Sequence, residues 1–321
     1  MERTLRIASV GTSAIMKTMQ EGIRLTQGLE TQVVYSRDSR RGRAFADEMG
    51  VRESCDDYEA MLARPDIDVV YLASPNRFHA EQALLALEHG KHVIVEKPAA
   101  VRVNDARAMR EAAKAHGVFF FEAITTLFMP NYLAYREAFG RLGDIRGAKL
   151  CFGRYSSKYD AYLRGELPNI FNPRMDGGAL NDMGVYCVHV AVDLFGRPER
   201  VRYEPETGRD GIDLAGTLYL EYPDLTCTVE TAKCRNLPCG CLVEGTRGRV
   251  CQQGMVNSFE NCRAWLDGEA IDLNRQEDGN RMIYELGRFR DAILSRDQVF
   301  FERMCLQSET VAWILEQAAK R

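Results

Sequence analysis

Short apolar runs alternate with amphipathic segments as far as residue 121. Each run has the length of a buried strand, whereas the segments between them carry apolar residues at helical spacing. This alternation is typical of βαβ units, which build a parallel sheet with helices on both faces. The predicted strands are Leu5 to Val10, Gln32 to Tyr35, Val69 to Ala73, His92 to Val95 and Val118 to Phe121.

Two helices between these strands have recognisable ends. Arg77 to His89 carries an apolar stripe and stops at Gly90, and a second helix is expected to be capped by Asn104 and to end at Gly117. We therefore predict that residues 1–121 form a Rossmann domain, a doubly wound parallel α/β sheet that binds a dinucleotide.

Beyond Glu122 the pattern changes to longer strands. Pro223-Asp224 separates two of them and predicts the turn of an antiparallel hairpin. Residues 122–321 therefore predict an α+β domain with an open, mainly antiparallel sheet. Its expected elements are a helix at Asn131 to Phe139, strands at Ile145 to Tyr155, Leu214 to Tyr222 and Thr226 to Lys233, and late helices at Tyr284 to Leu294 and Gln307 to Ala319, the last of which could pack back on the first domain.

Length and charge narrow the class of protein. A chain of 321 residues favours two domains with a cleft between them. A net charge of -4 gives no long-range attraction to nucleic acid. No apolar stretch approaches the roughly 18 residues that span a bilayer, and the amino terminus lacks the pattern of a secretory signal. We expect a soluble protein that binds neither nucleic acid nor membrane.

The ten cysteines are scattered, and several fall inside apolar strand patterns, as reduced thiols do. This distribution predicts a cytoplasmic protein. Cys239-Gly240-Cys241 could be taken for a metal site, but its spacer is shorter than the two to four residues usual between zinc ligands, so strand packing is favoured and no metal is expected.

The first strand runs into a glycine turn that opens a helix. In this context backbone N–H groups and the helix amino terminus can bind a pyrophosphate, which makes Gly11, Thr12, Ser13 and Ile15 candidate cofactor contacts. The motif is degraded, because Ser13 and Met16 stand where a second glycine and a small residue are usual. A plain strand-to-helix turn is the alternative.

The end of the second strand bears on the choice of cofactor. NAD-binding domains carry an acid there for the ribose hydroxyls, whereas this chain has Ser36, Arg37 and then Arg41. A hydroxyl and guanidinium groups suit a 2′-phosphate, so we predict that NADP is preferred over NAD. The alternative is a solvated helix start in which Asp38 interacts with the helix dipole.

Three further side chains suggest proton handling. Lys97 follows the strand His92 to Val95, and ligands of open α/β sheets bind at the carboxyl ends of the strands. Asp182 and Tyr186 are four residues apart, which places them on one side of a helix. A phenol with a pKa near 10 becomes a useful proton donor or acceptor when a cation such as Lys97 lowers that pKa. The alternative makes Tyr186 a half-buried helix residue and Asp182 a cap.

Together these motifs resemble the glucose-fructose oxidoreductase, inositol dehydrogenase and rhizopine-catabolism (Gfo/Idh/MocA) family along nearly the whole chain. The likeness is carried by the glycine loop, Ala73-Ser74-Pro75-Asn76 with His79, Glu96-Lys97-Pro98, Glu122-Ala123, and Gly177-Gly178 through Tyr186. With tyrosine instead of histidine at position 186, the chain resembles the dihydrodiol, xylose and glucose-fructose branch of the family, not the inositol branch.

The resemblance implies a sugar, polyol or dihydrodiol oxidoreductase, with the nicotinamide near Lys97 and Tyr186. It also implies that the Lys97-Pro98 peptide is cis and that the carboxyl-terminal sheet forms a homodimer or homotetramer. Lys97, Tyr186 and Asp182 would be the catalytic residues, with Asp182 binding the substrate or the lysine. Further cofactor contacts implied by the resemblance are Ser74, Pro75, Asn76, His79, Glu96, Lys97 and Glu122.

The substrate pocket departs from that branch. Its members carry an aromatic-arginine pair and a histidine before proline, whereas this chain has Ile124 to Pro130 there. Lys158 and Arg174, in a long polar segment, are candidate contacts to a carbohydrate-like substrate, or else part of a solvated crossover loop. His189, on the helical face of Tyr186, is a further substrate candidate, with helix packing as its alternative.

Two other functions fit the same motifs. An NAD-dependent glycosidase would oxidise its substrate transiently, eliminate the glycosidic bond and reduce the product again. A dinucleotide-sensing regulator would bind the cofactor without turnover. Retention of Lys97 and Tyr186 argues against the sensor, since a protein that only binds has no need of a proton donor.

Overall fold

A computed structural model describes residues 3–277 and 279–320, and the polypeptide divides into two units. Unit 1 consists of Met1–Ala123 with Gly279–Glu309. Unit 2 consists of Ile124–Asp278 with Thr310–Arg321.

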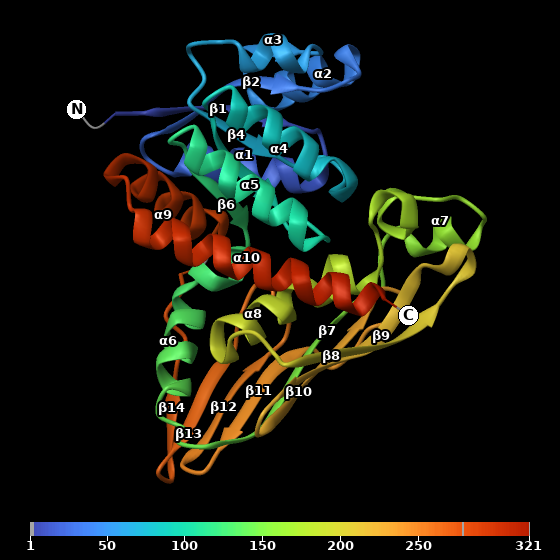
Figure 1. Cartoon of the computed structure of the whole chain (residues 1–321), viewed down its shortest axis with the longest axis vertical. Helices are drawn as coiled ribbons and strands as arrows, with labels where there is room; N and C mark the ends of the chain where they lie inside the picture. Colours follow the sequence, from blue (N-terminus) through green and yellow to red (C-terminus); the bar gives the residue numbers. More distant parts are fainter. Residues whose placement is uncertain (1–2, 278, 321) are drawn as a thin grey trace. The chain divides into compact units, whose positions relative to one another are not determined.

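The sheet of unit 1 is parallel throughout, which confirms the predicted Rossmann architecture. Its six strands follow the order β3-β2-β1-β4-β5-β6, so the order reverses between β1 and β4, where such sheets bind nucleotides (Figure 1). The strands are β1 (Leu5–Val10), β2 (Leu29–Tyr35), β3 (Glu53–Cys55), β4 (Val69–Leu72), β5 (His92–Glu96) and β6 (Phe120–Ala123).

The helices of unit 1 include two neighbouring pairs, α4 with α5 and α1 with α9. The predicted stop before Gly90 is confirmed, because α4 ends at Glu88 and Gly90 has a φ of 70°. The predicted cap at Asn104 is wrong, since α5 begins at Val103 and Arg102 is its N-cap. The helices are α1 (Ala14–Leu25), α2 (Ser39–Met49), α3 (Tyr58–Leu62), α4 (His79–Glu88), α5 (Val103–Ala115) and α9 (Met282–Ser295).

Helices on both faces explain the buried strands of unit 1. All four residues of β4 are buried, as expected for a central parallel strand. In β6, the ring of Phe121 stacks on Phe289 of α9 with centroids 4.7 Å apart, and it also contacts Phe300 and Phe301. These phenylalanines lie in the first turn of α10 (Gln298–Ala319), which therefore starts nine residues before the predicted Gln307.

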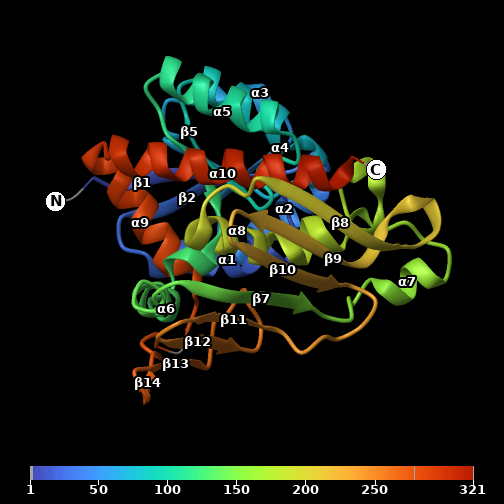
Figure 2. The same ribbon diagram turned by 60° about the horizontal axis from the view of Figure 1, so that its bottom comes forward.

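The sheet of unit 2 is mixed but mainly antiparallel, as predicted. Its order is β14-β13-β12-β11-β7-β10-β9-β8, and only the β7–β10 pair among these described neighbours is parallel (Figure 2). The hairpin at Pro223-Asp224 joins β9 to β10. The strands are β7 (Ile145–Gly153), β8 (Arg200–Thr207), β9 (Asp213–Tyr222), β10 (Leu225–Ala232), β11 (Gly240–Gly245), β12 (Gly248–Gln253), β13 (Cys262–Leu266) and β14 (Glu269–Asp272).

Helices cover one face of this sheet. α8 contacts β7 and β10, while α6 contacts β12 and β13. Burial alternates along β10, where Cys227, Val229 and Thr231 are buried and the residues between them are less covered. The helical segments of unit 2 are η2 (Thr125–Phe128), α6 (Pro130–Phe139), α7 (Tyr159–Leu163), η3 (Asn169–Phe171), η4 (Pro173–Met175), the π-helix η5 (Leu180–Gly184), α8 (Val185–Phe195) and η6 (Arg209–Gly211).

Two general features of the described chain bear on the sequence analysis. Within residues 3–277 and 279–320, no helix combines the length and apolarity needed to cross a bilayer. All ten cysteines lie in the described part of the chain and are free thiols.

Candidate functional site

The glycine turn of unit 1 has a steric cause. Gly11 has a φ of 111°, and a Cβ there would lie 2.8 Å from the carbonyl oxygen of Ala73, so the turn after β1 requires glycine. Ser13 is the N-cap of α1 in an extended conformation, and Met16 lies in the core. Met16 is thus accommodated by packing in the core, and α1 begins directly after the turn.

At the end of β2, Asp38 caps the following helix while the nearby arginines stay exposed. Asp38 caps α2, because its carboxylate accepts the Arg41 N–H at 3.0 Å. Arg37 and Arg41 are exposed, and the Arg37 guanidinium lies 5.2 Å from the centre of the Phe78 ring. Capping by Asp38 therefore leaves both guanidinium groups exposed beside the end of β2.

The turn after β4 is tied to the turn after β5 by His79. Its Nδ1 lies 2.9 Å from the Pro98 oxygen and its Nε2 lies 2.8 Å from the Ser74 oxygen. Burial lowers the pKa of His79, against the two carbonyl groups, which raise it. Only 1% of this residue's surface is exposed, and its two contacts link both turns. Its predicted contact with the cofactor stays a prediction.

Two buried carboxylates fix the Lys97 turn from either side. Glu96 accepts a hydrogen bond from the Tyr71 hydroxyl at 2.6 Å, and Glu122 accepts one from the Ala99 N–H at 2.9 Å. The Lys97-Pro98 peptide is cis, as predicted. Glu96 and Glu122 are both buried, and these contacts support the turn that carries Lys97. Their predicted contact with the cofactor stays a prediction.

The remaining predicted cofactor residues of this edge lie in the same two turns of unit 1. Ser74 donates a hydrogen bond to Gln82 Oε1 at 2.6 Å, and Pro75 precedes the short helix η1 (Asn76–Phe78). The carboxyl ends of β1, β4 and β5 therefore bring together Gly11, the Ser74 turn and the Lys97 turn, as the parallel sheet predicts.

In unit 2, the paired glycines make room for the half-buried carboxylate of Asp213. Asp213 accepts hydrogen bonds from the Leu180 N–H and from the Tyr203 hydroxyl, both at 2.8 Å. A Cβ on Gly178, whose φ is 116°, would overlap the Asp213 carboxylate, and one on Gly177 would lie 2.7 Å from the Asn169 oxygen. Burial raises the pKa of Asp213, opposed by these hydrogen bonds and by Lys233.

The segment after the glycines differs from the regular helix that the sequence predicted. Asp182 lies in the π-helix η5, and Tyr186 lies in the first turn of α8. A π-turn is wider than an α-turn, so a spacing of four residues no longer fixes a shared face. Tyr186 is half-buried, with its ring edge-on to Phe152 at 5.6 Å between centroids.

The partner of Asp182 is a residue that was not predicted from the sequence. The carboxylate forms an ion pair with the ammonium of Lys233, which directly follows β10. The alternation of that strand was the available signal, because it places residue 233 on the covered face with Val229 and Thr231. His189 is also wholly buried, which favours its packing alternative over substrate contact.

Lys158 and Arg174 lie on either side of an aromatic cluster of unit 2. Both side chains are exposed. Lys158 precedes α7, and Arg174 lies in η4. The cluster joins Tyr159, Tyr162 and Phe171, with 5.1 Å between the centroids of Tyr162 and Phe171. The segment between Lys158 and Arg174 is therefore held by packing of its own aromatic side chains.

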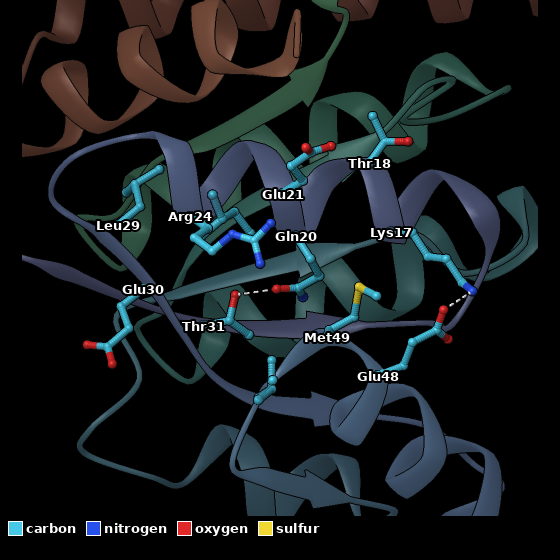
Figure 3. Close-up of a pocket in the computed structure, with 13 residues that line it drawn as sticks. Lys17, Thr18, Gln20, Glu21, Arg24, Leu29, Glu30, Thr31, Glu48 and Met49 are labelled. Atoms are coloured by element: carbon cyan, nitrogen blue, oxygen red, sulfur yellow. Dashed lines mark hydrogen bonds and ion pairs between the residues drawn. The ribbon is translucent and has the colours of Figure 1, made fainter. Parts of the chain in front are cut away.

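A cavity of about 550 Å³ in unit 1 does not coincide with these turns (Figure 3). Its described lining residues run from Lys17 to Val51 and include none of the predicted site residues. Neighbouring side chains already pair across it, Lys17 with Glu48 and Thr31 with Gln20.

Comparison with known families decides the class of protein. A family model described as an oxidoreductase family with an NAD-binding Rossmann fold matches residues 5–124, and the GFO/IDH/MocA C-terminal domain matches residues 137–251. The chain belongs to the Gfo/Idh/MocA oxidoreductase family. Its first unit is thus an NAD(P)-binding Rossmann domain, and the protein is an enzyme of the oxidoreductase class.

Among curated members of the family, scyllo-inositol 2-dehydrogenase (NADP(+)) IolU of Bacillus subtilis is 32% identical over 99% of this chain and 97% of its own length. The human trans-1,2-dihydrobenzene-1,2-diol dehydrogenase is 31% identical over 89% of this chain and 87% of its own. The likeness to the dihydrodiol branch is thereby confirmed, and an inositol dehydrogenase is similar as well.

Two solved structures share the fold of this chain. A levoglucosan dehydrogenase in complex with NADH and levoglucosan superposes with a TM-score of 0.86 at 20% identity, covering 99% of this chain and 98% of its own. KijD10, a 3-ketoreductase from Actinomadura kijaniata in complex with NADP and TDP-benzene, gives 0.85 at 21% identity, covering 98% and 97%. At these identities the likeness concerns the fold alone.

Proposed function

We propose that the protein is an NADP-preferring oxidoreductase that interconverts a CH–OH group and a carbonyl of a sugar, polyol or dihydrodiol. The observation that carries this proposal is the turn of Lys97. This turn follows strand β5 of an NAD(P)-binding sheet. Three residues around Lys97 in the turn are each held by a hydrogen bond: Glu96 by Tyr71, Pro98 by His79, and Ala99 by Glu122. So many contacts around one lysine favour a role in which its exact direction matters.

The proton chemistry is assigned to Tyr186. In oxidation the substrate hydroxyl gives its proton to the phenolate of Tyr186, and in reduction the phenol returns a proton to the substrate oxygen. Lys97 stabilises both the phenolate and the negative charge that develops on the substrate oxygen. The nicotinamide, when bound, accepts or supplies the hydride. Asp182 orients the substrate by accepting a hydrogen bond from a hydroxyl group.

The preference for NADP rests on the end of β2. Arg37 and Arg41 are exposed there, and Ser36 adds a hydroxyl. Relatives differ in this respect, since IolU is named for NADP(+), whereas the levoglucosan dehydrogenase is described with NADH. The choice must therefore come from this chain's own residues. Guanidinium groups favour a phosphate over ribose hydroxyls, because they form charge-assisted hydrogen bonds.

Replacing Arg37 and Arg41 with Ala is expected to weaken NADPH binding by about tenfold or more, since a hydrogen bond to a charged group contributes roughly 1.5–3 kcal/mol. NADH binding should change little. Fluorescence titration of both cofactors measures the two dissociation constants, with the exposed Arg52→Ala as the matched control. A wild-type protein that binds NADH more tightly than NADPH would contradict the assignment.

Unit 2 is proposed to recognise the substrate. Lys158 and Arg174 are the proposed contacts, supported by their exposure on a loop with a packed aromatic base. We further propose that residues 122–321 act as the substrate and oligomerisation domain, forming a homodimer or homotetramer through the sheet of strands β7 to β14. A cytoplasmic location stays a prediction from the cysteine distribution.

One assay tests the function. The absorbance of the reduced nicotinamide is followed with both cofactors against a panel of aldoses, ketoses, polyols including inositols, and dihydrodiols. Turnover of at least one class supports the proposal. Binding of cofactor without turnover would favour the sensor, and cleavage of nitrophenyl glycosides without added cofactor would favour the glycosidase.

A further inference from the structure

Lys233 is a charged side chain in an unusual place. It directly follows β10, and none of its surface is exposed. Lysine is almost never fully buried unless it is paired. Its partner is Asp182, whose carboxylate binds the ammonium while 28% of the aspartate side chain stays exposed. The pair therefore joins the interior of unit 2 to an accessible carboxylate.

An aromatic ring and a second carboxylate also lie near the ammonium of Lys233. The ammonium lies 5.3 Å from the centre of the Phe171 ring, a distance at which a cation is attracted to the ring face. Asp213 lies close enough for Lys233 to lower its pKa, although burial raises that pKa more strongly. The backbone is fixed as well, because Lys233 N–H donates to the Leu214 oxygen at 2.7 Å. Two carboxylates and a ring face thus surround one cation.

These contacts hold the π-helix at two points. Asp213, at the start of β9, accepts the Leu180 N–H at the beginning of η5. Lys233, beyond the end of β10, binds Asp182 in the middle of η5. The π-helix that leads into Tyr186 is therefore anchored to the β9–β10 hairpin through side chains. Such widened turns are frequent at functional sites, where they need support from the surrounding structure.

We propose that Lys233 is a positioning residue for the substrate reaction. Its buried ammonium fixes the direction of the Asp182 carboxylate, and so the hydrogen bond that Asp182 offers to the substrate. Lys233 itself touches neither substrate nor cofactor. This inference rests on the proposed function, because it takes Asp182 as a substrate contact.

A double-mutant cycle tests the proposal on the full-length protein. Lys233→Met and Asp182→Asn, made singly, should each lower kcat/KM by about 10- to 100-fold, as expected when a contacting group is misplaced by about 1 Å. The double variant should be no slower than Asp182→Asn alone, because Lys233 acts only through Asp182. NADPH affinity should stay within about twofold of wild type in all three, since the cofactor turns lie in unit 1.

The matched control is Lys114→Met, on helix α5 of unit 1. That lysine is 45% exposed and pairs with Glu302, so its loss should leave kcat/KM unchanged, as expected for a surface ion pair. A Lys233→Met variant with wild-type kcat/KM would overturn the proposal. The proposal would also be overturned if the two effects were additive, that is, if Lys233→Met lowered kcat/KM by the same factor in the Asp182→Asn background as in the wild type.

Instability of Lys233→Met would not end the test. That variant leaves a carboxylate without its buried partner, whereas the double variant removes both charges and should fold better. Equal kcat/KM for Asp182→Asn and the double variant supports the proposal, and a further loss overturns it. If wild-type protein turns over no substrate, the proposed function fails, and the positioning role fails with it. In that case, non-additive changes in unfolding temperature among the wild type, the two single variants and the double variant would show that the ion pair is purely structural.

Discussion

Lys97→Met and Tyr186→Phe are each expected to lower kcat/KM by about 10²- to 10⁴-fold, the range that positioned proton transfer usually contributes. The two replacements act on one proton transfer. Met keeps the length of the lysine side chain but removes its charge, and Phe keeps the ring but removes the hydroxyl. The double variant should therefore be little slower than the worse single variant, because groups that act as a unit have non-additive effects.

Matched controls separate chemistry from folding. Lys114→Met removes an exposed lysine of α5, and Tyr284→Phe removes the hydroxyl of a half-buried tyrosine of α9. Both should keep wild-type kcat/KM and wild-type unfolding temperatures. The assignment of the catalytic pair is wrong if Lys97→Met and Tyr186→Phe both turn over the substrate at the wild-type rate.

Gly178→Ala should cause the largest loss of stability among single glycine replacements in the substrate segment. Its φ of 116° disfavours any side chain, and the added methyl would overlap the Asp213 carboxylate. The backbone costs about 1–2 kcal/mol, and losing the Asp213 hydrogen bond to Leu180 N–H adds about 1–3 kcal/mol. We expect the free energy of unfolding to fall by about 3 kcal/mol or more, together with loss of activity.

Gly165→Ala isolates the backbone contribution. Gly165 has a comparable φ of 101°, but a Cβ there meets its nearest atom, on Arg209, only at 3.9 Å. Its free energy of unfolding should therefore fall by only about 1–2 kcal/mol. Equilibrium urea unfolding followed by circular dichroism compares the two variants. Equal losses in both would show that Asp213 does not require glycine at position 178.

The motif glycines Gly11 and Gly178 mark positions where two distant parts of the chain come close together. Gly11 and Gly178 both lie where a side chain would meet another part of the chain, Ala73 in one case and Asp213 in the other. Neither partner is a neighbour in sequence. The glycines thus mark close approaches whose other half only the fold supplies.

Much of the sheet architecture followed from the sequence alone. β1 was predicted to the residue, and the hairpin at Pro223-Asp224 and the helix end before Gly90 were confirmed. These features depend on local chemistry: apolar runs, turn residues and glycines with positive φ. The start of α10 was missed by nine residues, because Phe300 and Phe301 are ordered by packing on Phe121, which no local pattern shows.

The sequence by itself determined the parallel sheet, the strand ends that carry Gly11 and Lys97, and the residue types available for proton transfer. Only the tertiary structure decided the partners of the buried polar and charged groups: Glu122 with the Ala99 N–H, His79 with Pro98, and Lys233 with Asp182. The physical reason is that spacing along a strand or helix sets which side a residue faces. The group that satisfies a buried charge comes from another element, brought near by the packing of the whole unit.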